Sequence, residues 1–273
     1  MARSRIVMAL AALSLAATVA PSSTAVAAEQ GCSLAATGGT VTRTIGLRSY
    51  NLRVPAGLTA PAPLLLSIHG LGSFPFGQEF STGWSAYADS KKFIVAYPAG
   101  NFNHWNVDRG SPDVTFLRSV VDAISAKYCV DPRRVYAEGG SLGSWMSQRL
   151  ACDAADMFAA VSATMGGAPT WWGACTPGRS VGVSLFHGES DPLINVALGR
   201  EARDEWVARN SCDPTPVVEP VSNGSAMSYQ GCAGGVSVTW RTYAGLGHAY
   251  PTGADGQDFR DRAWRHLTGH VLP

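Results

Sequence analysis

The chain has 273 residues, 15% of them charged, and a formal net charge of +1. An average soluble domain is about 25% charged. Without clusters of basic residues, the composition gives no electrostatic reason to expect binding to nucleic acid or to an anionic membrane. We therefore expect no nucleic-acid partner, and an uncharged or interfacial substrate fits this chain better.

The first residues have the pattern of an export signal. Two arginines precede an apolar, alanine-rich stretch at residues 6–20, and small residues then lead to an A-x-A-type cleavage site near Ala27. The apolar stretch is shorter than the roughly 20 residues that a membrane-spanning helix needs. We predict a signal peptide over residues 1–28 and a secreted protein without integral membrane association. The remainder, residues 29–273, has the size of one catalytic domain.

The six cysteines all follow the predicted cleavage site. An even number in an exported chain indicates disulfides, and six cysteines allow 15 pairings. No C-x-x-C spacing is present, which argues against a structural zinc site. From the layout we predict three bonds: Cys212–Cys232, Cys129–Cys152 and Cys32–Cys175. The first would close a Gly/Ser/Pro-rich excursion, and the second would join the ends of two helices that flank one strand.

Apolar strand-like runs alternate along the chain with segments of helical spacing. Residues 41–45 and 50–54 predict a hairpin. Further strands are predicted at 64–68, 93–97, 135–137, 158–163, 181–186 and 236–243. Helices are predicted at 113–128, from the serine turn to about 150, at 196–209 and at 259–267. Buried strands that alternate with helices predict a single-domain α/β fold with a mostly parallel sheet covered on both faces.

One glycine-rich turn lies between a predicted strand and a predicted helix. Residues 139–143 have the sequence Gly-Gly-Ser-Leu-Gly. The G-x-S-x-G nucleophile elbow requires this strand–turn–helix context. Glycine suits such a crowded turn, and a helix N-terminus favours negative charge on a substrate oxygen. We therefore predict that Ser141 is a nucleophile rather than only a polar residue in a loop.

A serine hydroxyl needs a base that accepts its proton. Among the histidines, His248 lies in a glycine-rich loop after the last predicted strand and is our predicted base. His69 and His187 each precede a glycine at a strand end, so we expect them to bond the loop backbone. His266 and His270 lie in or just after the last helix, and we expect them at the surface.

The carboxylate that orients the base should lie between the serine and the histidine. The loop at residues 187–192 has the sequence His-Gly-Glu-Ser-Asp-Pro and offers Glu189 and Asp191. An Asp-Pro pair can also simply form a turn. We choose Asp191, because Ser–Asp–His is the chain order of the α/β hydrolases.

An oxyanion needs two N–H donors. The geometry of the elbow assigns one to the backbone of Leu142, directly after the serine. The second should come from the His-Gly-Leu-Gly loop at residues 69–72, with Leu71 as our choice and Gly70 as the alternative.

Three tryptophans are candidates for an apolar substrate wall: Trp105, Trp171 and Trp172. For Trp105, packing in the core is an equal alternative. The adjacent Trp171 and Trp172 cannot easily bury both rings in the same way, and their glycine and proline neighbours predict an exposed loop.

Several segments in their order resemble one family of exported α/β-hydrolase esterases. The segments are LLLSIHGLG, IVAYPAG, HWNVD, DVTFLRSVVDAISAKYCVDPRRVYAEGGSLGSWMSQRLAC, FAAVSA, LFHGESDPLINV and GLGHAYP. The family contains polyhydroxyalkanoate depolymerases and bacterial feruloyl and acetylxylan esterases. The resemblance implies the α/β-hydrolase fold and the triad Ser141, Asp191 and His248, which matches the choice made from the residues.

The chain departs from many of these relatives at two places. It has Leu71 where they have a cysteine or a second glycine, and Leu142 where they have alanine or asparagine. It also shows no linker to a polymer-binding domain.

The resulting prediction is a secreted, monomeric serine ester hydrolase that needs neither a metal nor an organic cofactor. A polyhydroxyalkanoate depolymerase is the first choice. A feruloyl or acetylxylan esterase is the alternative, and an acyltransferase or a cell-wall-binding protein is the hypothesis from a different class.

Overall fold

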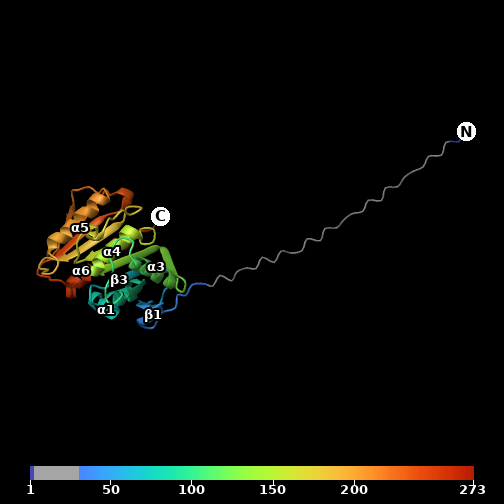
Figure 1. Cartoon of the computed structure of the whole chain (residues 1–273), viewed down its shortest axis with the longest axis horizontal. Helices are drawn as coiled ribbons and strands as arrows, with labels where there is room; N and C mark the ends of the chain where they lie inside the picture. The colour runs from blue at the N-terminus through green and yellow to red at the C-terminus, as the bar shows by residue number, and fades with distance from the viewer. Residues whose placement is uncertain (3–30) are drawn as a thin grey trace. The chain divides into compact units, whose positions relative to one another are not determined.

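The computed structural model describes residues 1–2 and 31–273 of the chain (Figure 1). The predicted signal peptide and its cleavage site fall almost entirely on residues 3–30, outside the described residues. The signal peptide and the domain limits at residues 28 and 29 therefore stay predictions. Residues Cys32–Pro273 form one compact unit by their contacts.

Ten strands in the described part of the chain form one sheet, in the order β1-β2-β4-β3-β5-β6-β7-β10-β9-β8. The strands are β1 (Val41–Ile45), β2 (Arg48–Arg53), β3 (Ala62–Ile68), β4 (Ile94–Pro98), β5 (Val130–Gly140), β6 (Ala160–Thr164), β7 (Gly182–Gly188), β8 (Val217–Glu219), β9 (Ser225–Tyr229) and β10 (Val238–Tyr243). The six strands from β4 to β10 in this order pair in parallel, and the strands at both edges pair antiparallel. The predicted mostly parallel sheet is confirmed.

Six α-helices of the described residues accompany the sheet. They are α1 (Pro75–Thr82), α2 (Trp84–Lys91), α3 (Pro112–Ser125), α4 (Leu142–Asp153), α5 (Val196–Arg209) and α6 (Gly253–Thr268). Side-chain caps start two of them: Ser111 accepts from the N–H of Asp113 at α3, and Asn195 accepts from the N–H of Ala197 at α5. Helices α3, α4, α5 and α6 agree with those predicted from the sequence, whereas α1 and α2 were not predicted.

The missed helix α1 has an unusual pattern. Its buried positions are Gln78 and Thr82, whereas Phe76 and Phe80 are exposed. A helix whose inner face is polar does not show the apolar stripe by which core-facing helices are recognised. The edge strand β8 and its neighbour β9 were not predicted either, because they are short and mix polar with apolar residues.

The core has two halves, one on each face of the sheet. Leu64, Leu65 and Leu66 of β3 are consecutive and fully buried, because side chains of a strand alternate between faces that are both covered. Leu64 and Leu66 pack in a cluster with residues of α3, α4 and α5, whereas Leu65 packs in a second cluster with residues of α2 and α6. Helices therefore cover both faces, as the continuous apolar runs predicted.

The disulfides correct two of the three predicted pairings. The bonds are Cys32–Cys129, Cys152–Cys175 and Cys212–Cys232, so only the last prediction is confirmed. The segment at Ser33 pairs with the chain after α3, since its N–H donates to the carbonyl of Lys127 over 2.9 Å. Arg149 of α4 donates to the carbonyl of Ala174 over 2.9 Å. These contacts between distant segments bring the bonded cysteines together, and the spacing along the sequence does not reveal them.

Within residues 31–273, no helix combines the length and the apolar character that crossing a bilayer requires.

Candidate active site

Ser141 stands between the end of β5 and the first residue of α4, with φ 56° and ψ −122°. A positive φ is uncommon for a residue with a side chain, and it persists only where the surroundings enforce it. Here the N–H of Ser141 donates to the carbonyl of Thr164 over 3.0 Å, and its carbonyl accepts from the N–H of Ser144 over 2.8 Å. The tertiary structure thus holds a strained turn at the carboxyl edge of the sheet.

The glycines of this turn have no room for a side chain. A Cβ atom at Gly139 would overlap the carbonyl oxygen of Gly143, and one at Gly143 would overlap the carbonyl oxygen of Ile68 in β3. A Cβ at Gly140 would come within 2.7 Å of the Tyr250 hydroxyl. Residues 139–143 are called the elbow below. Gly139 and Gly143 must be glycine because strand, helix and turn approach one another there through their backbones.

His248 and Asp191 meet at the same edge of the sheet. His248 Nδ1 lies 2.8 Å from Asp191 Oδ2, and the Asp191 side chain is fully buried. The other carboxylate oxygen, Oδ1, accepts from the N–H groups of Leu193 and Ile194, each over 2.9 Å. The loop therefore holds the carboxylate so that one oxygen is left for the imidazole of His248, whose side chain is 16% exposed.

The sheet explains why residues 57 positions apart in the sequence meet. Asp191 follows β7 and His248 follows β10, and these strands are parallel neighbours, so their carboxyl ends lie at one edge. Gly188 packs so tightly against the His248 loop that a Cβ there would overlap the carbonyl oxygen of Leu246.

The structure also separates the two carboxylates that the sequence offered. Glu189 is exposed, and its Oε1 accepts from the Thr242 hydroxyl over 2.6 Å. Asp191, and not Glu189, is hydrogen-bonded to His248.

His69 and His187 bond the loop backbone, as expected from the sequence. His69 Nδ1 lies 2.7 Å from the carbonyl of Gly70, and its Nε2 accepts from the N–H of Gly100 over 2.9 Å. His187 Nε2 lies 2.8 Å from the carbonyl of Ile194 and 3.5 Å from Asp191 Oδ2. Burial lowers the pKa of both imidazoles below the ordinary value of 6.5, so both are neutral at neutral pH.

The loop at residues 69–72 lies against the serine. A Cβ at Gly70 would come within 3.2 Å of the Ser141 Cβ. Among the described residues, the backbone N–H groups of Leu71 and Leu142 donate to no protein acceptor. Leu142 is the first residue of α4, where N–H groups have no partner inside the helix. Both donors named from the sequence are thus free to bind a substrate oxygen.

The three tryptophans have different surroundings. Trp105 is fully buried, and its Nε1 donates to the carbonyl of His69 over 2.9 Å. The expectation that Trp105 lines a substrate wall is therefore wrong, since its ring packs inside the core. Trp171 and Trp172 are 46% and 40% exposed, and the Trp171 ring lies 5.7 Å from the ring of Trp145 in the first turn of α4.

His266 corrects a second expectation. It is buried on α6 rather than exposed, and burial lowers its pKa to about 3. His270 is half-buried and accepts from the N–H of Ser237 over 3.2 Å. The rings of the two histidines lie 4.7 Å apart, and a Cβ atom at Gly182 in β7 would come within 2.7 Å of the His270 ring, so His270 packs against the sheet.

A set of exposed apolar side chains, not predicted from the sequence, lies on the loop that contacts the serine and on segments next to it. Five large apolar side chains, between 49% and 95% exposed, lie on the loop at 69–72, on and just before α1, and on the turn after β4. This aromatic rim consists of Leu71, Phe74, Phe76, Phe80 and Phe102. The N–H of Gly72 donates to the carbonyl of Asn103 over 2.9 Å, which joins the loop to the turn. Phenylalanines at 76 and 80, four residues apart on a helix whose inner face is polar, could have revealed the rim.

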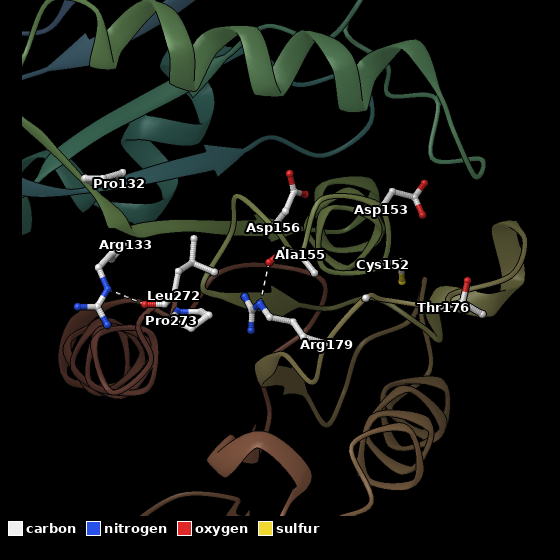
Figure 2. Close-up of a pocket in the computed structure, with 11 residues that line it drawn as sticks. Pro132, Arg133, Cys152, Asp153, Ala155, Asp156, Thr176, Arg179, Leu272 and Pro273 are labelled. Atoms are coloured by element: carbon white, nitrogen blue, oxygen red, sulfur yellow. Dashed lines mark hydrogen bonds between the residues drawn. The ribbon is translucent and has the colours of Figure 1, made fainter.

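A large cavity of about 700 Å³ lies elsewhere (Figure 2). Its lining includes residues near the start of β5 and residues just before β6 and β7, whereas Ser141 follows the carboxyl end of β5. Its two arginines are engaged with the backbone: Arg179 donates to the carbonyl of Ala155 and Arg133 to that of Leu272, each over 2.7 Å (Figure 2). Because the cavity contains neither the serine nor a histidine, it is not the candidate active site.

Comparisons with known proteins place the chain. It is 32% identical to feruloyl esterase D of Neurospora crassa over 82% of this chain and 84% of that protein. It is 29% identical to poly(3-hydroxyalkanoate) depolymerase C of Paucimonas lemoignei, over 72% of this chain and 57% of that protein. It is also 29% identical to a bifunctional acetylxylan esterase/xylanase of Neocallimastix patriciarum, over 78% of this chain and 32% of that protein. The chain thus spans about a third to little more than half of the last two relatives.

Among solved structures, the acetyl xylan esterase of Aspergillus awamori superposes with a TM-score of 0.68 at 18% identity, over 82% of this chain and 98% of that one. No model of a protein family matches the chain.

The parallel sheet, with a serine on a sharp strand-to-helix turn, has the architecture of the α/β hydrolases. The chain belongs to the α/β-hydrolase family of carboxylic ester hydrolases that contains these feruloyl esterases, acetylxylan esterases and polyhydroxyalkanoate depolymerases. The resemblance drawn from the sequence is confirmed.

Proposed function

We propose that this protein is a secreted serine ester hydrolase that acts through an acyl-enzyme and whose substrate is a polyester of the polyhydroxyalkanoate type. The observation that carries the proposal is the strained elbow that presents Ser141 at the edge where His248 is bonded to Asp191 over 2.8 Å. Three disulfides support export, because such bonds persist in oxidising compartments.

The chemistry follows from the roles that these groups can take. Ser141 Oγ attacks the ester carbonyl carbon while His248 Nε2 takes its proton. Asp191 holds the proton of the imidazole on Nδ1 and stabilises the imidazolium that forms. The N–H groups of Leu142 and Leu71 bind the oxyanion. His248 then gives its proton to the leaving alcohol, and water repeats the sequence on the acyl-enzyme.

The aromatic rim favours a polymeric substrate. Its member Leu71 lies in the loop at 69–72, which contacts Ser141, and Gly72 of this loop is bonded to Asn103, next to Phe102. Large exposed apolar patches commonly mark binding surfaces. A solid polyester could cover this rim while one of its ester groups reaches the serine, whereas a small soluble ester would leave the rim in water.

The alternative is a feruloyl or acetylxylan esterase. It is favoured by the half-exposed rings of Trp171 and Trp172, which lie beside Trp145 in the first turn of α4 and offer an aromatic surface to a feruloyl group. A panel of polyhydroxyalkanoate emulsions, methyl ferulate and acetylated xylan distinguishes the candidates. Preferential hydrolysis of methyl ferulate or acetylated xylan would reject the polyester.

Replacing Ser141 tests the mechanism. Ser141→Ala should lower kcat on a p-nitrophenyl ester about a million-fold, because the nucleophile is lost. The matched control is Ser144→Ala in the first turn of α4, which should keep its activity because the buried Ser144 hydroxyl has no hydrogen-bond partner among the described residues. Wild-type activity in Ser141→Ala would reject the proposed triad.

The rim has its own test. Phe76→Ser combined with Phe80→Ser should lower the rate on a polyester emulsion about tenfold or more, since each phenylalanine loses the free energy of burying an aromatic side chain. Hydrolysis of a soluble ester should be unchanged. Val217→Ser with Val218→Ser, which removes two exposed apolar side chains from the edge strand β8, should change neither rate. Equal losses on both substrates in the rim variant would contradict a role in polymer binding.

Size-exclusion chromatography of the purified protein tests the expected monomer.

A further inference from the structure

A carboxyl group is buried beneath the elbow. Glu138 lies in β5, three residues before Ser141, and is fully buried. In the described part of the chain, no arginine, lysine or histidine side chain forms a hydrogen bond or ion pair with it. Burying a carboxyl group without a cation is costly. Such a group needs an explanation that the ester chemistry alone does not supply.

Four side chains donate to the two oxygens of Glu138: Gln78 on α1 reaches Oε2 over 3.4 Å, and three donors from other segments lie closer. The Tyr250 hydroxyl donates to Oε1 over 2.6 Å. The hydroxyl of Ser67 in β3 donates to Oε2 over 2.8 Å, and Nε1 of Trp84 in α2 donates to the same oxygen over 3.1 Å. These donors come from the neighbouring strand, the covering helix and the loop that carries His248.

The direction of these bonds is set by Gln78 on the inner face of α1. Its Nε2 donates to the Tyr250 hydroxyl over 2.9 Å and to the Ser67 hydroxyl over 3.0 Å. Because each hydroxyl already accepts from the amide, its own hydrogen is directed at Glu138. The cluster as bonded therefore surrounds the carboxylate with donors, an arrangement that suits an ionised carboxylate, which only accepts.

Tyr250 connects this cluster to both halves of the candidate site. It lies two residues after His248 in the same loop, and its hydroxyl would come within 2.7 Å of a Cβ atom at Gly140, the residue before Ser141. Tyr250 is buried, and its ring lies 5.5 Å from that of Phe259 in α6. A shift of the Tyr250 hydroxyl therefore shifts the loop of His248 relative to the elbow.

We propose that Glu138 is a positioning residue of the active site: its buried carboxylate, through Tyr250, holds the loop of His248 in register with the elbow that carries Ser141. The inference rests on the proposed function, since it assumes that His248 is the base. It assigns a role to the polar inner face of α1, which supplies Gln78 to the same cluster.

The ionisation of Glu138 makes this positioning pH-dependent. Burial raises its pKa from the ordinary 4.5 to about 7, against the hydrogen bonds from Tyr250, Ser67 and Trp84. The other titratable groups that face it are Tyr250 and, on β4, Tyr97, and burial raises the pKa of both tyrosines, which stay neutral. The groups presented by the other packed elements are neutral: Ser67 on β3, Ser162 on β6, Gln78 on α1 and Trp84 on α2. Glu138 is thus the group of this cluster that changes charge near neutral pH.

Stability and activity should respond to pH in opposite directions. The folded state binds the Glu138 proton more tightly than the unfolded state, so the contribution of Glu138 to stability is greatest below pH 4.5 and is lost as the pH rises to about 7. Positioning requires the charged form, which is populated only as the pH rises through about 7. The active form of the cluster is then the less stable one, a known cost of functional sites.

Glu138→Gln tests the proposal, because glutamine keeps the shape but cannot ionise and brings hydrogens that oppose the donors. At alkaline pH we expect kcat on a soluble p-nitrophenyl ester to fall about 10- to 100-fold, the size of effect that a small misplacement of a catalytic group produces, with KM unchanged. The pH profile of kcat should lose the ionisation near pH 7 that belongs to Glu138. A folded Glu138→Gln enzyme with the wild-type kcat and pH profile would overturn the proposal.

Tyr250→Phe provides the second test. It removes the link but keeps the ring, so it should lower kcat as Glu138→Gln does. The double variant should be no slower than the slower single variant, since both changes break one connection. Effects that multiply would show that the two residues act separately and would overturn the proposal. The matched control is Tyr87→Phe, which removes a tyrosine–carboxylate bond to Asp261 in the same core cluster and should leave kcat unchanged.

These outcomes are separate from a failure of the proposed function. If Ser141→Ala keeps its activity, the triad itself is rejected. If Ser141→Ala is inactive while Glu138→Gln behaves as the wild type, only the positioning role is rejected.

Discussion

Ser141 is placed by main-chain packing, whereas His248 and Asp191 are placed by side-chain hydrogen bonds. Gly139 and Gly143 of the elbow lie against carbonyl groups of α4 and β3. Asp191 is held by two loop N–H groups, and His248 by the bond to Asp191. A backbone clash cannot be relieved by a rotamer change, but a lost hydrogen bond leaves the fold in place. Substitutions in the two regions should therefore fail differently, the first by loss of structure and the second by loss of rate.

The largest effect should follow Gly143→Ala. The added Cβ would overlap the carbonyl oxygen of Ile68 in β3, and neither backbone can move freely. We expect the variant to lose more than about 4 kcal/mol of unfolding free energy or to fail to fold, as measured by urea denaturation. In Gly178→Ala the new Cβ meets nothing within 4 Å, so its stability should stay within about 0.5 kcal/mol of wild type. Equal stability of the two variants would contradict backbone packing as the support of the elbow.

Asp191→Asn should remove rate without removing structure. An amide can present the wrong tautomer to His248 and cannot stabilise an imidazolium, so kcat should drop about 10⁴-fold with the thermal midpoint little changed. Glu189→Gln is the matched control, because its carboxylate bonds the Thr242 hydroxyl of β10 and should be dispensable for catalysis. If the control loses as much kcat as Asp191→Asn, the assignment of the orienting carboxylate is wrong.

The smallest effect should come from Gly70→Ala. Gly70 lies against both the backbone of the elbow and the side chain of Ser141. A Cβ there would lie 3.2 Å from the Ser141 Cβ, which demands a shift of a few tenths of an ångström rather than a rebuilt turn. We expect kcat to fall by up to about 100-fold in a folded enzyme. Gly39→Ala, whose Cβ would meet only the end of the Arg53 side chain at 3.9 Å, should be silent. If Gly70→Ala instead unfolds as Gly143→Ala does, the loop at 69–72 is needed for the fold itself and not only for the position of Ser141.

Much of the fold was predictable because local pattern and burial agree. The runs at 64–68 and 181–186 are buried on both faces, and continuous apolar sequence is the signature of such strands. The helix α1 failed the same reasoning, because Gln78 faces inward to bind Glu138, Ser67 and Tyr250. Its hydrophobic pattern reflects the requirements of the site rather than those of the core.

The candidate site was predictable in part. Ser141, Asp191 and His248 could be named because each follows a strand, and parallel strands bring their carboxyl ends to one edge. Whether Trp105 faces substrate or core could not be decided in advance, because its burial depends on His69 and the loops around it. The disulfide partners were unpredictable for the same reason.

The sequence by itself determined the buried strands of the parallel sheet, four of the helices, the chain order of serine, aspartate and histidine, and the need for glycine at the elbow. All of these follow from local chemistry and from the periodicity of burial. The tertiary structure decided which cysteines bond, that Trp105 is buried, and that Glu138, Gln78 and Tyr250 share one hydrogen-bond cluster. These are contacts between residues far apart in the chain, and they arise only when the sheet and helices close around them.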